Sequence, residues 1–522
     1  MLMSSADYRE SLRRYSPRVF VDGARVASVV DAPALSPGIN ALGLTYDFAL
    51  RDELAPIMLA VQASSGKTVN RMLHVDQSSA DLLNKLEAVR VLCQETGCAQ
   101  RYLAHDAFSA LVQSSARIDA DKATRYGERF TAWLHDFQDK DLSIGIAMTD
   151  AKGDRSKRPH EQANVDSYVH IVEKNAKGIV ISGTKAIVTA APYVHEFLVM
   201  PCRNLSEADA AFAVCCAVPC DADGVTIVAR PAGRPGEKAA LFSNKYGQST
   251  GVVVFDRVFV AWERVFLAGE WEHSSHLTYS YATHHRHTCI AARAGFGDLL
   301  IGAGALMCEA NGFDPAEESH LREQMVQLIT IVEGFYACGV AASVYASADP
   351  GSTTVMPDPV FSNIGKLLLA NQIYEMHRIA HYVSGGLIVT LPGPDEDHNP
   401  ETAAHLADVL RANPAVPYDK RIEAARLIED LTASYQGGWY SVISLHGGGS
   451  PEAMKQEIWR NYPVGNKVDL VERLLERNVL AQPGRKIAAN RQPGKCCDAG
   501  CTPPAQTTMV ALPRPRPGET PR

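Results

Sequence analysis

The first part of the chain carries apolar residues at the spacing of amphipathic helices. Two stretches show the pattern best, residues 85–113 (KLEAVRVLCQETGCAQRYLAHDAFSALVQ) and residues 123–138 (ATRYGERFTAWLHDFQ). Proline, which interrupts helices, is nearly absent from both. The pattern predicts an N-terminal helical domain over residues 1–140.

The pattern changes between residues 141 and 270. Two β-branched runs in SYVHIVEKNAKGIVISGTKAIVTAA are joined by a turn-like NAKG, and further runs follow in HEFLVMPC, AAFAVCCAVP, GVTIVARP and STGVVVFDRVFVAWERVFL. Short apolar runs separated by Gly, Asn and Pro are typical of strands joined by tight turns. We therefore expect a central antiparallel β domain over residues 141–270.

Helical spacing returns over residues 271–485 and predicts a C-terminal helical bundle. One apolar stripe consists of Met325, Leu328, Ile329, Val332, Phe335 and Tyr336. A second long helix is expected to stop at Gly385 and Gly386. Residues 486–522 are rich in Pro, Lys and Arg and predict a disordered tail. The fold class expected is α+β, mostly α.

Composition narrows the class of protein. The chain has 522 residues, 46% hydrophobic and 21% charged, with a net charge of −8. These values are typical of globular proteins, and the negative charge argues against nucleic-acid binding. The start is polar and no long uncharged apolar run is present, so we expect a cytoplasmic protein without a membrane span. The 12 cysteines are too sparse for a disulfide scaffold, and the tail's CCxxxC is a weak zinc signal.

Two segments have the composition of anion-binding loops. MTDAKGDRSKRP, residues 148–159, combines a glycine with four basic side chains. HGGGSP, residues 446–451, places three glycines before a helical stretch, where free N–H groups can hold a phosphate. A solvated turn is the alternative for each. The nucleotide motifs GxGxxG after a strand and GxxxxGK[ST] are both missing.

These two segments, with YVHIVEKNAKGIVISGTKAIVTAAPYVHEFLVMP, VVVFDRVFVAWERVFLAGE, HRHTCIAARAGFGDLLIGA and SGGLIVT, resemble the 4-hydroxyphenylacetate 3-hydroxylase / 4-hydroxybutyryl-CoA dehydratase family of flavoproteins. The resemblance covers about residues 5–470. It implies an acyl-CoA dehydrogenase-like fold and an FAD cofactor. The FAD-binding residues it implies are Met148, Thr149, Asp150, Lys152, Gly153, Asp154, Arg155, Thr189, Gly448, Gly449 and Ser450.

The dehydratase branch of this family holds an iron–sulfur cluster on three Cys and one His, next to a catalytic Tyr. Cys98 and His285 match two of the ligands, whereas Tyr102 and Ala292 stand at the other two positions and Cys289 at the catalytic Tyr. A cubane cluster needs four ligands, so we expect no metal. The alternative is a rearranged ligand set of Cys93, Cys98, His285 and Cys289.

The hydroxylase branch binds its phenol with an Arg, a Tyr four residues later and a His. Arg101 matches the Arg, while His105 stands at the Tyr position and Ile146 at the His position. The i, i+4 spacing aims Arg101 and His105 the same way on a helix. The alternatives are an ion pair of Arg101 with Glu95 or Asp106 and a structural role for His105.

The resemblance therefore predicts an FAD-dependent enzyme, with Arg101, His105 and His285 as catalytic residues. The first reading is a two-component monooxygenase that acts on a small aromatic or electron-rich substrate and receives reduced FAD from a separate flavin reductase. The alternative is an acyl-CoA dehydratase or isomerase with His285 as proton shuttle, and a non-catalytic flavoprotein is a third reading. The resemblance also implies a homotetramer.

Overall fold

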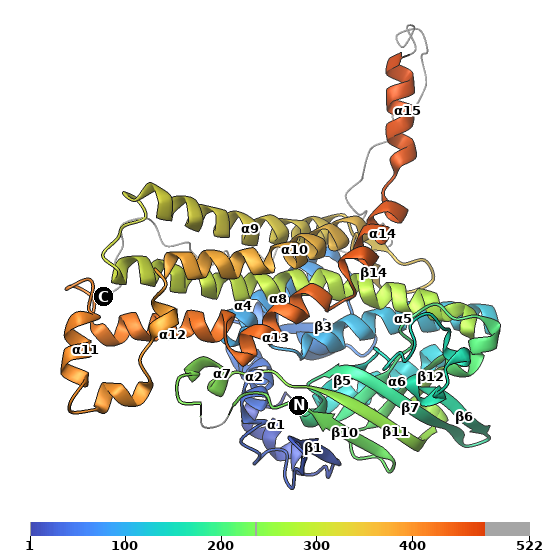
Figure 1. Cartoon of the computed structure of the whole chain (residues 1–522). Helices are drawn as coiled ribbons and strands as arrows, with labels where there is room; N and C mark the ends of the chain where they lie inside the picture. Colours follow the sequence, from blue (N-terminus) through green and yellow to red (C-terminus); the bar gives the residue numbers. More distant parts are fainter. Residues whose placement is uncertain (1, 235–236, 476–522) are drawn as a thin grey trace.

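The computed structural model describes residues 2–234 and 237–475, in which a layer of long helices lies along one side of the sheets (Figure 1). The predicted C-terminal tail, with Cys496, Cys497 and Cys501, lies outside the described residues. The N-terminal part contains α1 Ser5–Leu12, β1 Val19–Val21, β2 Ala24–Arg25, α2 Ser36–Asp47, α3 Ala55–Met58, β3 Leu59–Gln62, β4 Lys67–Asn70, α4 Ser79–Thr96, α5 Tyr102–Lys122 and α6 Tyr126–Asp139.

The central part is built of strands, as the sequence predicts. It contains β5 Ile144–Ala147, β6 His170–Asn175, β7 Gly178–Thr189, β8 Glu196–Val199, β9 Val214–Pro219, β10 Val225–Ala229, α7 Leu241–Lys245, β11 Thr250–Ala261 and β12 Val265–Ala268. One sheet has the order β2-β1-β10-β11-β7-β6 and the other β12-β9-β8-β5. The predicted turn NAKG joins β6 to β7.

Two details differ from a helical N-terminal domain followed by an antiparallel β domain. The sheets are mixed, because β5 runs parallel to β8 and β1 runs parallel to β10. The N-terminal region also does not form a purely helical domain, since Val19 pairs with Ile227 and adds β1 to the larger sheet. Parallel pairing joins strands far apart in the sequence, which periodicity within one strand does not reveal.

The C-terminal part is a helical bundle with two short strands. It contains α8 Ser274–Ala310, α9 Ser319–Val344, β13 Ser347–Ala348, β14 Val355–Met356, α10 Pro359–Val383, α11 Ala403–Val409, α12 Tyr418–Thr432, α13 Tyr435–His446, α14 Pro451–Asn461 and α15 Val464–Leu475. Helices α8, α9 and α10 pack side by side, and α15 projects away from the body (Figure 1). The predicted stop is confirmed, because α10 ends just before Gly385 and Gly386, both at positive φ.

Helix α9 buries most of its predicted stripe, but Ile329 is 42% exposed. By length and composition alone, Trp271–Ala310 and Ser319–Val344 could each cross a membrane. Both pack in the bundle against α4 and α10, as core helices of globular folds do.

Candidate active site

The helical pattern that runs from residue 85 to residue 113 is interrupted in the structure. Helix α4 ends at Thr96 and α5 begins at Tyr102, because Gly97 adopts a φ of +67°. A Cβ at Gly97 would lie 2.5 Å from Oη of Tyr440, so a larger residue would force the two segments apart. The break leaves Cys98 between α4 and α5, facing α8 and α13.

A cavity of about 40 Å³ lies at this break. It is lined by residues from the break, from α5, from the end of β7 and from α8, α10 and α13. They are Cys98, Gln100, Tyr102, Leu103, Thr189, His285, Cys289, Arg293, Lys366, Leu369, Trp439, Ile443, Ser444 and Gly447.

A chain of three polar side chains reaches the cavity from α5 and α8. Nδ1 of His285 lies 3.0 Å from Oδ2 of Asp106, and Nε2 of His285 lies 3.4 Å from Sγ of Cys289. Thr288 donates a hydrogen bond to Oδ1 of Asp106 at 2.6 Å. The ring of Tyr281 stacks on that of His285, with centroids 5.4 Å apart. The imidazole is therefore fixed on both nitrogens and on one face.

Charge within this group is set by burial and by close partners. Burial lowers the pKa of His285, but Cys289 and Asp106 outweigh it and raise that pKa above its ordinary value. Burial raises the pKa of the Cys289 thiol, but His285 and Lys366 bring it below its ordinary value. Burial lowers the pKa of Lys366 to about 8, although Cys289 acts in the opposite direction. The cavity thus holds an acid and a base whose pKa shifts favour opposite charges.

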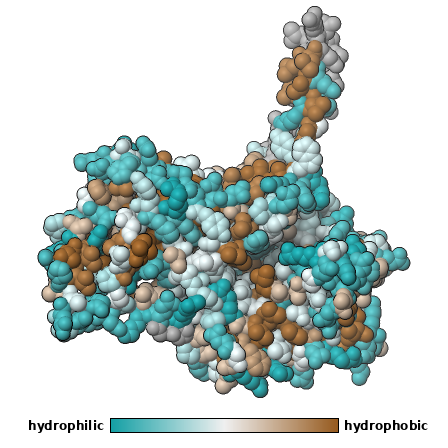
Figure 2. All heavy atoms as spheres, viewed as in Figure 1, coloured by the Kyte–Doolittle hydropathy of each residue, from teal (hydrophilic) through white to brown (hydrophobic). Residues whose placement is uncertain are grey.

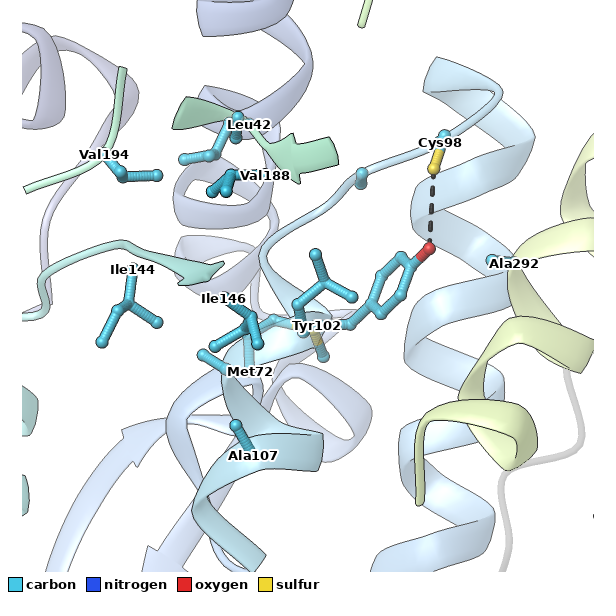
Figure 3. Close-up of a cluster of buried hydrophobic side chains, with 14 of the residues drawn as sticks. Leu42, Met72, Cys98, Tyr102, Ala107, Ile144, Ile146, Val188, Val194 and Ala292 are labelled. Carbon is cyan, nitrogen blue, oxygen red and sulfur yellow. Dashed lines mark hydrogen bonds between the residues drawn. The ribbon is translucent and has the colours of Figure 1, made fainter. Parts of the chain in front are cut away.

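Cys98 lies across the cavity in a cationic setting. Nη2 of Arg293 donates to its Sγ at 3.4 Å, and Oη of Tyr102 lies 3.6 Å from the same sulfur (Figure 3). A hydrogen bond with Cys93 lowers the pKa of Cys98, burial opposes this, and Arg293 lowers it further, to about 6. Nη1 of Arg293 is buried and has no hydrogen-bond partner among the described residues.

The residues at the cluster positions do not fit an iron–sulfur cluster. Of the four, Tyr102 points its hydroxyl at Cys98 and Ala292 offers a methyl group (Figure 3). The Arg293 guanidinium occupies the space beside the Cys98 sulfur. Within residues 2–234 and 237–475, His, Cys, Asp and Glu form no group of three that could hold a metal ion. The rearranged set with Cys93 and Cys289 is therefore not assembled either.

The predicted FAD-binding segment 148–155 runs along β7. Its backbone pairs with this strand, since Ala186 N donates to Thr149 O at 2.7 Å, and Asp150 forms a buried ion pair with Lys185 at 2.7 Å. Met148 and Thr149 are half-buried, and Asp154 accepts hydrogen bonds from Ser156. Because Thr189 ends β7 and lines the cavity, one strand connects the segment to the cavity.

The chemistry of the 148–155 segment fits an anionic cofactor. Lys152 and Gly153 have positive φ, which turns the backbone outward. Arg155 is exposed, and neither Lys152 nor Arg155 makes an ion pair within the described part of the chain. Two free cations on a pinned loop are suited to phosphate groups.

The second predicted FAD loop lies directly beside His285. Arg286 donates to Gly448 O at 2.8 Å, and Ser450 caps the N-terminus of α14. Gly448 and Gly449 have φ of +75° and +102°. A Cβ at Gly448 would meet Cδ2 of His285 at 3.4 Å, and one at Gly449 would meet Nη2 of Arg286 at 3.1 Å. Only glycine leaves this approach open.

Arg101 and His105 do not line the cavity. Arg101 is buried, pairs with Asp141 and has its guanidinium carbon 3.8 Å from the centre of the Tyr46 ring. Nδ1 of His105 lies 2.6 Å from Arg71 O, and its Nε2 lies 2.7 Å from Oδ1 of Asp76. Their substrate role stays a prediction, and the structure supplies both with protein partners.

Three groups of the site were not among the predicted site residues: Arg293 and Lys366 line the cavity, and Asp106 contacts it through His285. Asp106 lies four residues from Tyr102 on α5, and Arg293 lies four from Cys289 on α8, so helical spacing from a predicted residue points to both. Lys366 is an isolated cation in the apolar run IGKLLLA, a signal that a search for buried charges would find.

Comparisons with known proteins agree with this architecture. The N-terminal model of 4-hydroxyphenylacetate 3-hydroxylase matches residues 4–267 and the C-terminal model matches residues 274–476. A 4-hydroxybutyryl-CoA dehydratase/vinylacetyl-CoA-Δ-isomerase of Clostridium aminobutyricum is 34% identical over 90% of this chain and 99% of its own. An oxygenase component of 4-hydroxyphenylacetate 3-monooxygenase of Thermus thermophilus is 24% identical, over 91% of this chain and 97% of its own.

Solved structures share the fold. The archaeal 4-hydroxybutyryl-CoA dehydratase of N. maritimus superposes with a TM-score of 0.87 at 33% identity, covering 94% of this chain and 97% of its own. The oxygenase component of 4-hydroxyphenylacetate 3-monooxygenase, complexed with FAD, gives a TM-score of 0.80 at 21% identity over 92% and 99% of the two chains. The predicted fold class is confirmed, and the relative complexed with FAD agrees with the predicted cofactor. This chain belongs to the 4-hydroxyphenylacetate 3-hydroxylase family.

Proposed function

We propose that the protein is an FAD-dependent enzyme that moves a proton on a small acyl substrate, as a dehydratase or isomerase does, without an iron–sulfur cluster. The observation that carries this proposal is the chain Asp106–His285–Cys289 at the cavity. A paired acid and base at one position are what a proton shift from the α-carbon to the γ-carbon of an acyl group requires. The 34% sequence identity with the dehydratase/isomerase of C. aminobutyricum supports an acyl substrate.

The 148–155 segment, Thr189 and the 448–450 loop are proposed to bind the FAD. Lys152 and Arg155 would neutralise its phosphates, and Gly448 and Gly449 would let it approach His285 closely. When bound, FAD would supply a group that can accept electrons and give them back. The protein's own part is to hold the acyl carbon near His285 and Cys289 and to exclude water through Leu369, Trp439 and Ile443.

The proton steps follow from the two pKa directions. The raised pKa of His285 and the lowered pKa of Cys289 both favour an imidazolium beside a thiolate, and the proposed steps start from that pair. The thiolate accepts a proton from the α-carbon of a β,γ-unsaturated acyl group, and the imidazolium returns one to the γ-carbon as the double bond moves to the α,β position. Asp106 keeps the imidazolium oriented throughout.

A flavin monooxygenase is the second candidate. It is favoured by Tyr102 and Ala292, which remove two of the four ligands of the dehydratase cluster. This reading requires a separate flavin reductase, since the relatives of that activity are oxygenase components. It places substrate binding on Arg101 and His105, whose side chains are engaged elsewhere in this structure.

One experiment separates the two candidates. Purified FAD-loaded protein is incubated without oxygen in D₂O with vinylacetyl-CoA, and deuterium in the product is measured by mass spectrometry. The same protein is then supplied with reduced FAD, air and small phenols, and oxygen use is followed. We expect deuterium incorporation and no phenol-dependent oxygen use, and the opposite pattern would establish the monooxygenase.

Two variants test which histidine takes part in the proton transfer. His285→Gln is expected to slow deuterium incorporation by about 10²- to 10⁴-fold, the usual contribution of general acid–base catalysis. His105→Gln is the matched control and is expected to retain the rate per folded molecule. Iron and sulfide assays on the same preparation are expected to find neither in stoichiometric amounts, and equimolar clusters would overturn the cluster-free proposal.

A further inference from the structure

We propose that Cys289 is a nucleophile that bonds covalently to the β-carbon of an α,β-unsaturated acyl group held in the cavity, with His285 and Asp106 as its partners. The inference rests on the proposed function and its acyl substrate class, and it gives the Cys289 sulfur a second role: the thiolate that takes the proton of a β,γ-unsaturated acyl group adds to the β-carbon when the double bond is α,β.

The three side chains have the geometry of a nucleophile (Cys289), its proton-transfer partner (His285) and a carboxylate that orients the partner (Asp106). His285 and Cys289 are one turn apart on α8, so both side chains point to the same face. Nε2 of His285 is 3.4 Å from Sγ of Cys289, while Nδ1 is held 3.0 Å from Asp106. A nucleophile beside a base that is oriented by a third group is the general arrangement of covalent catalysis.

The charged groups around the pair come from three other places. Asp106 faces it from α5, Lys366 from α10, and Arg293 from the next turn of α8. Lys366 and His285 both favour a negative sulfur, and Asp106 compensates the imidazolium. Low-pKa thiols in cationic settings are the reactive ones in proteins.

Cys289, and not Cys98, is the thiol open to a ligand. Both residues line the cavity, but Cys289 is 9% exposed, whereas Cys98 is 1% exposed and its sulfur contacts Arg293 and Tyr102. Cys308, on the same helix, is fully buried outside the cavity. The three thiols therefore differ in their exposure and in the side chains that contact them.

A separate observation points to a ligand oxygen. Nη1 of Arg293 is buried, has no partner within the described residues, and belongs to a side chain that lines the cavity. A buried guanidinium N–H left without an acceptor is costly. The carbonyl oxygen of an acyl group would satisfy it and would be polarised by it.

The step conserves atoms and charge. The Cys289 thiolate forms a C–S bond to the β-carbon, and the π pair of the Cα=Cβ bond moves onto the α-carbon and carbonyl oxygen. His285 Nε2–H then delivers its proton to the α-carbon, which leaves a neutral thioether and a neutral imidazole. No electron is lost or gained. The reverse sequence expels the thiolate and restores the double bond.

Acrylamide, a three-carbon α,β-unsaturated amide, is a small probe that carries the reacting Cα=Cβ–C=O unit. Purified FAD-loaded protein is treated with acrylamide at neutral pH, and adducts on each cysteine peptide are followed by mass spectrometry. We expect Cys289 to react at least about tenfold faster in the wild type than in His285→Gln or Asp106→Asn, since loss of the partner lowers the thiolate fraction. Cys308 serves as the internal control and is expected to stay unmodified.

Folding of each variant is checked by its thermal unfolding, and Thr288→Val, which removes only the hydrogen bond to Asp106, replaces Asp106→Asn if that variant does not fold. Equal rates for Cys289 in all variants, modification of Cys98 first, or an unreactive Cys289 would each overturn the proposal. Labelling does not require turnover, so reactive Cys289 without deuterium exchange on vinylacetyl-CoA would refute the proposed reaction and leave the nucleophile standing.

Discussion

Arg101 illustrates what residue spacing does and does not reveal. The i, i+4 relation to His105 predicts a shared direction, whereas in the structure the two side chains are buried against different partners, Asp141 and Asp76. Spacing within a helix defines a face, but the neighbour that covers this face belongs to a distant part of the chain. For His285 the signal is broader, because a whole segment around it resembles the family.

Arg101→Ala is expected to destabilise the protein by about 3–5 kcal/mol, because it leaves the buried Asp141 carboxylate without its cation. Urea unfolding measures the change. Arg125→Ala removes an exposed ion pair with Glu128 and is the control, with an expected loss below about 1 kcal/mol. An Arg101→Ala protein of normal stability but raised KM would instead support the substrate-binding prediction.

Gly448→Ala tests the approach to His285. At a φ of +75° an alanine costs about 1–2 kcal/mol, and its Cβ would press on Arg286 and His285. We expect this loss in thermal unfolding, together with weaker FAD uptake. Gly438→Ala in α13 meets no atom within 4 Å and is expected to stabilise the protein slightly. Equal behaviour of the two variants would refute the close packing at Gly448.

At the scale of elements, local patterns predicted most helices and strands but not the break between α4 and α5. The turn before β7 and the end of α10 carry Asn and Gly, which signal chain reversal by themselves. Gly97 lies within an otherwise helical pattern, and its break becomes necessary only because Tyr440 approaches it from α13. The cavity at the break was therefore beyond what the sequence pattern could predict.

The segment that contains Arg155 is expected to contribute directly to FAD binding. Arg155→Ala should weaken FAD about ten- to a hundredfold, because a charge-assisted contact contributes about 1.5–3 kcal/mol. Fluorescence titration with FAD measures it. Lys157→Ala removes an equal charge two residues away and is the control, with a change below about threefold expected. FAD binding at wild-type strength in Arg155→Ala would remove the segment from the site.

Asp209 anchors the same segment. Its carboxylate pairs with Arg158 and His160, both at 2.6 Å. Burial raises the pKa of Asp209, but His160, Ser206 and Arg158 outweigh it and lower that pKa below its usual value. The anchoring is thus complete at neutral pH and is lost only as pH falls towards the lowered pKa.

In Asp209→Asn this acid-dependent contribution is missing at every pH. We expect trypsin to cleave after Arg155 and Lys157 faster than in the wild type at pH 7, as measured by peptide mass spectrometry. Asp166→Asn, on the neighbouring turn, is the control. Equal cleavage in both variants would show that Asp209 does not hold the segment.

At the scale of the whole molecule, apolar side chains remain uncovered on the bundle and on α15. Val468, Val471 and Leu475 share one face of α15 and are 48%, 52% and 76% exposed, and apolar atoms cover much of the projecting helix (Figure 2). A helix that carries such a face away from its own body gains little stability alone. We infer that it packs against other copies of the chain.

Light scattering at micromolar protein is expected to give four times the 56.6 kDa chain mass, the homotetramer that the family resemblance implies. A chain that ends at residue 463 is expected to assemble less tightly and to dissociate at lower concentration. Val442→Ser, an exposed apolar position on α13, is a control for general solubility. A monomeric full-length chain would contradict the assembly.

The parallel pairing of β1 with β10 has a consequence for the newly made chain. The pairing of β1 with β10 cannot form until Ile227, the partner of Val19, has emerged from the ribosome. At about 5–20 residues per second this wait is roughly 10–40 s. During that time the first helices can form from local contacts, while the edge that β1 will occupy does not yet exist. The nascent chain thus exposes an apolar strand for tens of seconds, a window in which a chaperone at the ribosome exit would shield Val19, Phe20 and Val21 from neighbouring chains.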